Sequence, residues 1–334
     1  MSRFVAELLS ELASAGGDPL VGAASLQRIR EVELLLPRST GGVSLECHLG
    51  RAAPRSDLVV RVFGRDRQDL FRDGGPRLEP ARRFAEAWAA PAPGMENVPY
   101  IDLEFDLDGS GRSCFVGAMI EPGLHHGMAV VPADRDSPTW MRSSSSYHVA
   151  SAVLRASEPS PVGQDTLRAV ERAFDALPRG GFVGHVGSLR CRQDDGEDLV
   201  RLIVSLPRRA VRAYLTAISW PGDLDALDSA LELYLGARAR RVDVDLNVNT
   251  SGLLPDTGFY RPVWTPYDDD VAGIASGLIG SGLATEQQAN ALTCFAARTG
   301  APVGGIPWTM TFKTKLDRAG RAAAKAYLSL LRIA

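Results

Sequence analysis

"WTMTFKTKLDRAGRAAAKAYLSLL" (residues 308–331) is the stretch that decides the fold of this chain. Residues 308–316 alternate between apolar and polar side chains, which is the period of a half-buried strand. The alanine-rich run after Gly320 has a high intrinsic helix propensity. It follows a strong strand and a short turn, however, so we predict that residues 322–330 form the second strand of a hairpin. Lys325 and Tyr327 then share one face of that strand, whereas in the alternative, a helix, they diverge.

The same hairpin pattern occurs four more times along the chain. The clearest single strand is "RVDVDLNVN" (241–249), in which valines and a leucine alternate with acidic and amide side chains. Strands with turn residues between them predict antiparallel pairs. The predicted hairpins are 43–50 with 57–64, 100–107 with 114–120, 181–189 with 199–207, 241–249 with 257–264, and 308–316 with 322–330.

Segments with a helical period separate the hairpins, so the sequence predicts an α+β protein built from five αββα repeats. These segments are residues 80–90, 137–157, 163–178, 207–218, 222–236, 268–282 and 284–299. No low-complexity linker divides the chain, and we expect a single domain over residues 1–334. Ten antiparallel strands in an open sheet would leave two unpaired edges, and closure removes them. We therefore predict a ten-stranded barrel with helices outside, and keep an open sheet as the alternative.

Composition and charge narrow the class of protein. The chain has 334 residues, is 45% apolar and carries a formal net charge of −3, with no long basic run. Nucleic acids and anionic membrane surfaces are therefore not expected partners. No apolar run reaches the roughly 18–20 residues of a spanning helix. The four cysteines are scattered without metal-ligand spacing, which indicates reduced core residues, no structural metal and a cytoplasmic location.

Strand parity assigns the polar faces to the inside of the predicted barrel, because the apolar faces must pack against the outer helices. A ten-stranded barrel is too wide for side chains alone to fill, so a polar chamber of mixed charge is a candidate active site. The predicted inward residues are Ser44, Glu46, His48, Arg61, Tyr100, Asp102, Glu104, Asp106, Arg201, Asp243, Asp245, Asn247, Lys313, Lys315, Lys325 and Tyr327.

A ring of five αββα repeats resembles the aromatic prenyltransferase barrels, and the indole prenyltransferases most of all. In that family a glutamate on the first strand accepts a hydrogen bond from the aromatic substrate, and "SLEC" presents Glu46 there. An arginine on the next strand holds the prenyl diphosphate, and "VVRVF" presents Arg61. Later strands carry K-x-Y pairs that hold the diphosphate and shield the carbocation. "AKAYL" presents Lys325 and Tyr327, and the sixth strand keeps Arg201.

The sequence departs from the family pattern on three strands. "CFVGAMI" lacks a K-x-Y pair, the sixth strand has Ile203 and Ser205 where Lys and Tyr are expected, and the eighth offers only Tyr260 and Arg261. Each lost cation removes charge-assisted contacts of roughly 1.5–3 kcal/mol. A diphosphate is then bound weakly, bound through Mg²⁺ bridged by carboxylates, or not used at all.

The acidic residues of the third and seventh strands allow two interpretations. Asp102, Glu104 and Asp106 on one strand, with Asp243 and Asp245 on another, suit either a Mg²⁺ site or a solvated face. His185 lies in the middle of its strand and is a candidate proton acceptor. No nucleotide-binding or hydrolase motif occurs, so no organic cofactor is predicted.

The resemblance implies an aromatic prenyltransferase of a specialised-metabolite pathway. An allylic diphosphate would ionise while held by Arg61, Arg201, Lys313 and Lys325, with Lys315 nearby and Tyr327 shielding the cation. Glu46 would orient the acceptor, a tryptophan or a Trp-containing peptide, and would take up the released proton. The first alternative is a barrel that no longer uses a diphosphate and modifies a peptide natural product by acid–base chemistry. The second is a ligand-binding barrel without catalysis.

Overall fold

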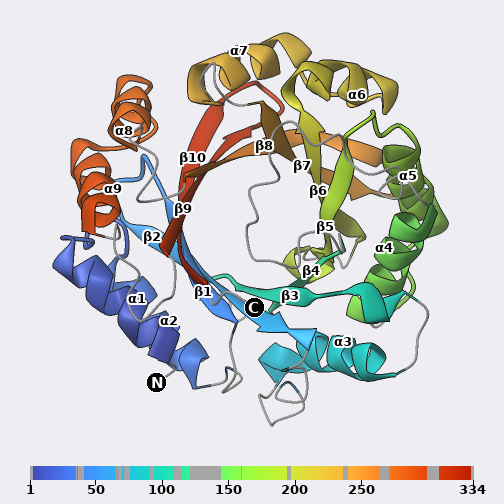
Figure 1. Ribbon diagram of the computed structural model, residues 1–334, viewed down its shortest axis with the longest axis horizontal. Helices are drawn as coiled ribbons and strands as arrows, with labels where there is room; N and C mark the ends of the chain where they lie inside the picture. The colour runs from blue at the N-terminus through green and yellow to red at the C-terminus, as the bar shows by residue number, and fades with distance from the viewer. Residues whose placement is uncertain are drawn as a thin grey trace.

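Ten antiparallel strands close into one barrel in the computed structural model, in the order β1-β10-β9-β8-β7-β6-β5-β4-β3-β2. The structure describes residues 3–34, 36, 41–64, 66, 70, 76–90, 94–107, 114–120, 144–158, 160–193, 197–235, 240–263, 271–298 and 308–331. Figure 1 looks down the barrel, with the first strands in blue beside the last strands in red. The predicted closed barrel is confirmed, and the alternative of an open sheet is wrong.

The strands agree with the hairpins predicted from alternation, with small differences at their ends. The final segment is a strand rather than a helix, because its partners β1 and β9 supply hydrogen bonds on both sides. The predicted turn at residues 108–113 lies outside the described residues. The strands are β1 (Gly42–His48), β2 (Arg55–Phe63), β3 (Tyr100–Phe105), β4 (Phe115–Met119), β5 (Phe182–Ser188), β6 (Leu199–Pro207), β7 (Arg241–Asn249), β8 (Gly252–Val263), β9 (Trp308–Leu316) and β10 (Ala322–Leu331).

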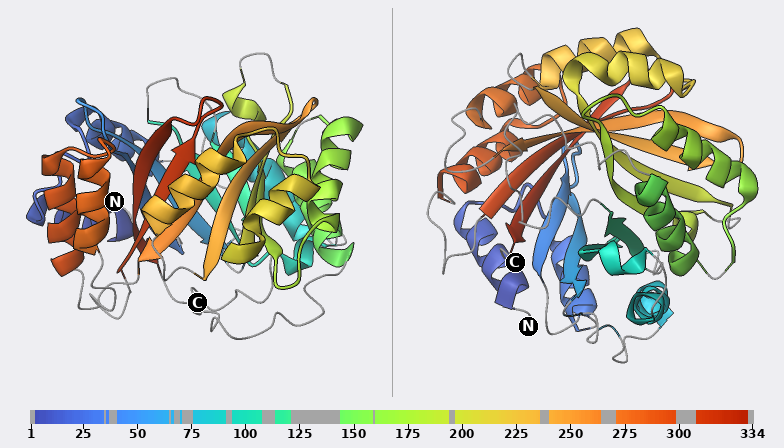
Figure 2. Two further views of the ribbon diagram at one scale, coloured as in Figure 1. Left: turned by 90° about the horizontal axis from the view of Figure 1, so that it is seen from above. Right: turned by 45° about the vertical axis from the view of Figure 1, so that its right-hand side comes forward.

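The described α-helices lie outside the barrel, and the views of Figure 2 agree on this. They are α1 (Arg3–Ser14), α2 (Ala23–Glu33), α3 (Glu79–Ala89), α4 (Ser144–Ser157), α5 (Gln164–Asp175), α6 (Val211–Ala217), α7 (Leu224–Leu235), α8 (Val271–Gly280) and α9 (Glu286–Arg298). Helix α4 is described from Ser144, and the earlier part of the predicted segment, 137–143, lies outside the described residues. Within the described ranges, no helix combines the length and apolar character needed to cross a bilayer.

The hydrophobic core lies between the helices and the outward faces of the strands. On β1 this face carries Val43, Leu45 and Cys47, all at most 1% exposed. On β7 it carries Val242, Val244, Leu246 and Val248, which are buried in the same way. Burial of apolar side chains on this outer layer is the main stabilising term, and it leaves the other face of strands such as β1 and β7 for polar groups.

Candidate active site on the inner face of the barrel

Strand register shows that the predicted polar residues share the inner face. Glu46 lies opposite Tyr327 on β10 and opposite Asp57 on β2. Side chains from strands that are not neighbours also meet: Arg201 of β6 bonds Glu104 of β3, across β4 and β5. Such contacts over intervening strands require the concave side of the sheet. Alternation decides which side chains face inward, because every second residue must do so once the apolar set faces the helices.

Three lysines gather on the inner face of β9 and β10. Lys313 lies directly opposite Lys325, and Lys315 follows two residues along β9. Burial lowers the pKa of Lys313 to about 8, against the attraction of Asp245. Burial also lowers the pKa of Lys315, and the charges of Lys325 and Arg201 add to this. The arrangement concentrates positive charge and is suited to an anionic group.

Two of these lysines have carboxylate partners within the chain. Lys313 pairs with Asp245 and donates to the Tyr260 hydroxyl at 2.8 Å. Lys325 pairs with Glu46. Of the residues that the structure describes, none forms an ion pair with Lys315. An incoming anion can therefore bind Lys315 without displacing a carboxylate.

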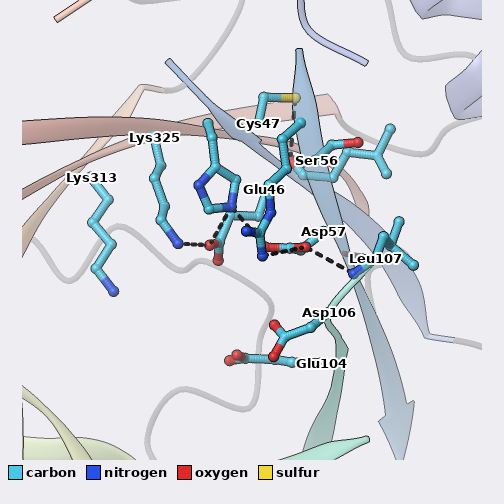
Figure 3. A network of polar contacts seen from close by, with 12 residues as sticks. Glu46, Cys47, Ser56, Asp57, Glu104, Asp106, Leu107, Lys313 and Lys325 are labelled. Carbon is cyan, nitrogen blue, oxygen red and sulfur yellow. Dashed lines mark hydrogen bonds and ion pairs between the residues drawn. The ribbon is translucent and has the colours of Figure 1, made fainter. Parts of the chain in front are cut away.

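Glu46 is held by an ion pair. Its carboxylate pairs with Lys325, it lies opposite Tyr327 of β10, and it is only 7% exposed. Burial by itself would raise the pKa of Glu46, but the ammonium groups of Lys325 and Lys313 hold that pKa well below its usual range. Figure 3 shows Lys325 reaching this carboxylate from the neighbouring strand. The side chain is a fixed anion rather than a proton carrier.

The arginines of the predicted site are also paired. Both nitrogens of the Arg61 fork donate to Asp102, at 2.9 and 3.0 Å, and the guanidinium lies 3.8 Å above the Tyr100 ring. Arg201 donates to both oxygens of Glu104 at 3.0 Å. The Arg61–Asp102 pair is bidentate and fixes the orientation of the guanidinium as well as its charge, whereas Arg201 contacts Glu104 through a single nitrogen, Nη1.

A continuous ion network crosses the inside of the barrel. It joins Arg201 to Asp245 at 3.6 Å and to Glu104, which also accepts from Arg192 at 3.2 Å. Arg192 in turn binds Asp106 at 2.7 Å. The interpretation of the acidic residues on β3 as a solvated face is therefore wrong: these carboxylates serve as counter-ions for arginines.

The remaining acidic residue of the predicted set, Asp243, differs from the others. It lies opposite Tyr260, and burial raises its pKa, which its neighbours Ser205 and Arg241 only partly oppose. Arg241 donates to the Ser205 hydroxyl at 3.1 Å. Asp243 is thus the carboxyl of this face with a raised pKa and is suited to holding a proton.

His185 lies on the far wall of the barrel from the lysines. Its Nε2 is 3.9 Å from the Asp102 carboxylate, and its Nδ1 is buried without a hydrogen-bond partner. Burial lowers the pKa of His185, although Asp102 and Glu104 act in the opposite direction. The imidazole is therefore neutral at physiological pH.

A group with metal-ligand chemistry lies at one end of β1 and β2. Glu46, His48 and Asp57 each offer one ligand atom, and these atoms lie within 4.8 Å of one another. His48 Nε2 is 2.7 Å from Asp57, whose other oxygen accepts from the Leu107 amide at 3.0 Å. Two carboxylates and an imidazole suit a divalent transition metal. This group of Glu46, His48 and Asp57 is distinct from the acidic residues of the third and seventh strands that the sequence suggested for Mg²⁺.

Three residues of the site were not predicted from the sequence. Asp57 lies four residues before Arg61 and shares its inward parity, so alternation followed back to the start of the predicted strand would have found it. Phe115 follows the same rule on β4, opposite Glu104. Arg192 lies in a short 3-10 helix after β5, where no periodicity indicates which side chain turns inward.

Comparison with known proteins supports the architecture. No family model matches the chain, and no curated protein does. Among solved structures, the apo form of the prenyltransferase PriB is similar, at 16% sequence identity and a TM-score of 0.52. The similarity covers 98% of this chain and 95% of that one. The chain therefore has the fold of a prenyltransferase barrel.

Proposed function

We propose that this protein is an aromatic prenyltransferase that transfers a prenyl group from an allylic diphosphate to an aromatic acceptor. The observation that carries the proposal is the cluster of Lys313, Lys315 and Lys325 beside two tyrosines on the inner face of this fold. Burial and neighbouring positive charges lower the pKa values of Lys313 and Lys315, both on β9, and a polyanion relieves that repulsion.

The diphosphate would first meet Lys315, which has no carboxylate partner in the described chain. Lys325 and Lys313 would then exchange part of their contact with Glu46 and Asp245 for phosphate oxygens. Such an exchange is weaker than binding by unpaired cations, because each carboxylate must be screened or moved away. We therefore expect a modest affinity for diphosphate.

The reaction would begin with heterolysis of the allylic carbon–oxygen bond, and diphosphate would leave with the electron pair. The rings of Tyr260 and Tyr327, whose centroids are 6.0 Å apart, lie beside the lysines. Aromatic faces stabilise cations, so we assign these rings to shielding the allylic cation. An aromatic carbon of the acceptor would then attack, and its proton would pass to a base on the inner face.

Pairing of the cations with carboxylates favours a second candidate. Arg61, Arg201, Lys313 and Lys325 each have an anionic partner in the apo protein. A barrel of this kind that no longer uses a diphosphate would modify its substrate, such as a peptide, by acid–base chemistry. Asp243 and His185 are the groups suited to that role, because their pKa values are shifted toward the neutral forms.

Turnover assays distinguish the two candidates. Purified protein is incubated with dimethylallyl, geranyl or farnesyl diphosphate and either tryptophan or a Trp-containing peptide, and products are analysed by mass spectrometry. Each assay is run with and without Mg²⁺, because carboxylates can bridge Mg²⁺ to a diphosphate. A prenylated product that is lost in Lys315→Met supports the proposal. Diphosphates that neither react nor raise the melting temperature contradict it and favour the second candidate.

A further inference from the structure

Lysine is rare in this chain, and every lysine lies on the inner face of the barrel. Of the 37 basic residues, only Lys313, Lys315 and Lys325 are lysines, and the others are arginines. Arginine carries the same charge and binds phosphate through two parallel hydrogen bonds. A position that keeps lysine among so many arginines therefore indicates a need for an amine, either for its size or for its chemistry.

Size and pairing account for two of the three lysines. Lys313 is only 2% exposed and pairs with Asp245. To do so it crosses Gly258, where a Cβ would come within 2.8 Å of Lys313 Cε, so the space is too narrow for a forked guanidinium. Lys325 pairs with Glu46 on the neighbouring strand. A carboxylate therefore fixes each of these two amines.

Neither reason applies to Lys315. In the part of the chain that the structure describes, no carboxylate forms an ion pair with it. Its neighbours in register are Gly258 on β8 and Ala323 on β10, so neither adjacent strand offers a polar side chain at this level of the barrel. Asp245 lies in the same row beyond Gly258, but Lys313 already pairs with it. The chemistry of the amine remains as the reason for lysine here.

Lys315 is also the more accessible of the two lysines on β9. It is the second-to-last residue of that strand, close to the exposed turn residues Arg318 and Ala319. Its side chain is half-buried, whereas that of Lys313 is almost fully buried. Solvent, and with it a dissolved small molecule, therefore reaches Lys315 near one end of the barrel.

The surroundings of Lys315 favour the neutral, nucleophilic form of its amine. Burial lowers the pKa of Lys315, and the charges of Lys325 and Arg201 lower it further, while Asp245 and Glu46 act in the opposite direction. Desolvation and a neighbouring cation are the two means by which enzymes activate a lysine toward carbonyl compounds. The same cations attract anions, so a carbonyl compound that carries a negative charge fits this place best.

We propose that Lys315 binds anionic carbonyl compounds of the 2-oxo acid class covalently, as an imine. The Nζ atom attacks the carbonyl carbon and forms a carbon–nitrogen double bond. The carbonyl oxygen leaves as water, together with the two hydrogens of the neutral amine. No oxidant, reductant or cofactor is consumed. This activity goes beyond prenyl transfer and needs no diphosphate, and an anion bound at the lysines would block it.

Reductive trapping of the full chain tests the proposal. Protein is incubated with glyoxylate and cyanoborohydride, which reduces an imine to a stable secondary amine, and the modified lysines are identified by mass spectrometry. Lys315 should be labelled at least about tenfold faster than Lys313 or Lys325, because each of those amines must first leave a carboxylate. Methyl glyoxylate, which has the same aldehyde without the charge, should label Lys315 more slowly, and pyrophosphate should protect it.

Two controls separate the fold from general lysine reactivity. Urea-unfolded protein should label all three lysines at similar rates, and Lys315→Arg, which keeps the charge, should abolish the fast labelling. The wild-type map decides even if that variant fails to fold. No labelling of Lys315, equal labelling of the three lysines in native protein, or equal rates with glyoxylate and its ester overturns the inference. Prenyl transfer without trapping would refute only this inference, and trapping without prenyl transfer only the proposed function.

Discussion

The ion pair of Glu46 and Lys325 illustrates how single residues behave on the inner face. The two side chains come from opposite ends of the chain and are only 9% and 19% exposed. Taking both charges out of water costs free energy that their attraction must offset. Either residue without the other would therefore leave a buried, unpaired charge.

Removing one half of this pair should destabilise the protein. Lys325→Met leaves Glu46 buried with one donor fewer, and we expect a loss of about 3–5 kcal/mol in the free energy of unfolding. The double variant Glu46→Gln with Lys325→Met removes both charges and should recover most of the loss. Urea denaturation of the three proteins measures this. Equal losses in the single and double variants would show that packing, not charge, is responsible.

Lys313 should make anion binding depend on pH. Its pKa is about 8, so the ammonium is charged below that pH and neutral above it. Pyrophosphate prefers the charged form, and its affinity should fall about tenfold between about pH 7 and about pH 9. Calorimetric titration measures the affinities, and Lys313→Met serves as the control because pyrophosphate itself titrates. A pH dependence identical in both proteins would assign the effect to the ligand alone.

At the scale of elements, the strands differ in what their inner faces can tolerate. Strand β9 places polar side chains at every inward position from Thr309 to Lys315. On β4 and β5 the inward positions 117 and 187 are glycine, because neighbouring rings occupy the space of a Cβ. Positions 117 and 187 therefore require glycine as specifically as other inward positions require a particular side chain.

Substitution at Gly117 tests this requirement. In Gly117→Ala the new methyl group meets the His185 ring, which must leave its position, and we expect a cost of about 1–3 kcal/mol in unfolding free energy. In a His185→Ala background the same substitution should cost little, since the ring is gone. Chemical denaturation of the four proteins gives the coupling energy. Additive effects would show that the two positions do not meet in solution.

At the scale of the whole molecule, closure joins the first strand to the last. β1 pairs with β10 from Gly42 opposite Leu331 to His48 opposite Lys325, so the described barrel has no edge strand. Glu46, Lys325 and Tyr327 meet only because of this pairing. The site therefore forms only when the barrel closes.

Hydrogen exchange should report this closure directly. Amides of β1 and β10 are bonded on both sides and should exchange as slowly as those of β6 and β7, because local opening without unfolding exposes no free edge. Mass spectrometry of peptides covering 42–48 and 322–331 provides the rates. Rapid exchange confined to these two strands would indicate that the β1–β10 pairing opens without unfolding of the rest of the barrel.

The sequence by itself indicated the hairpins and, on the strands that alternate clearly, the side that faces inward. Alternation has a period of two, so the apolar set on β1 or β7 leaves only one face for Glu46 or Asp245. The final strand was harder, since local propensity favoured a helix and only pairing on both sides decided for β10.

Tertiary structure alone decided which charges meet. Arg201 bonds Glu104 over two intervening strands, and Arg192 reaches Asp106 from an irregular segment. Neither contact follows from spacing along the chain, because the curvature of a closed barrel sets the distance between non-neighbouring strands. The same holds for His185, whose ring lies over Gly117 of the neighbouring strand β4. Periodicity specifies the direction of a side chain, and only the closed barrel specifies its partner.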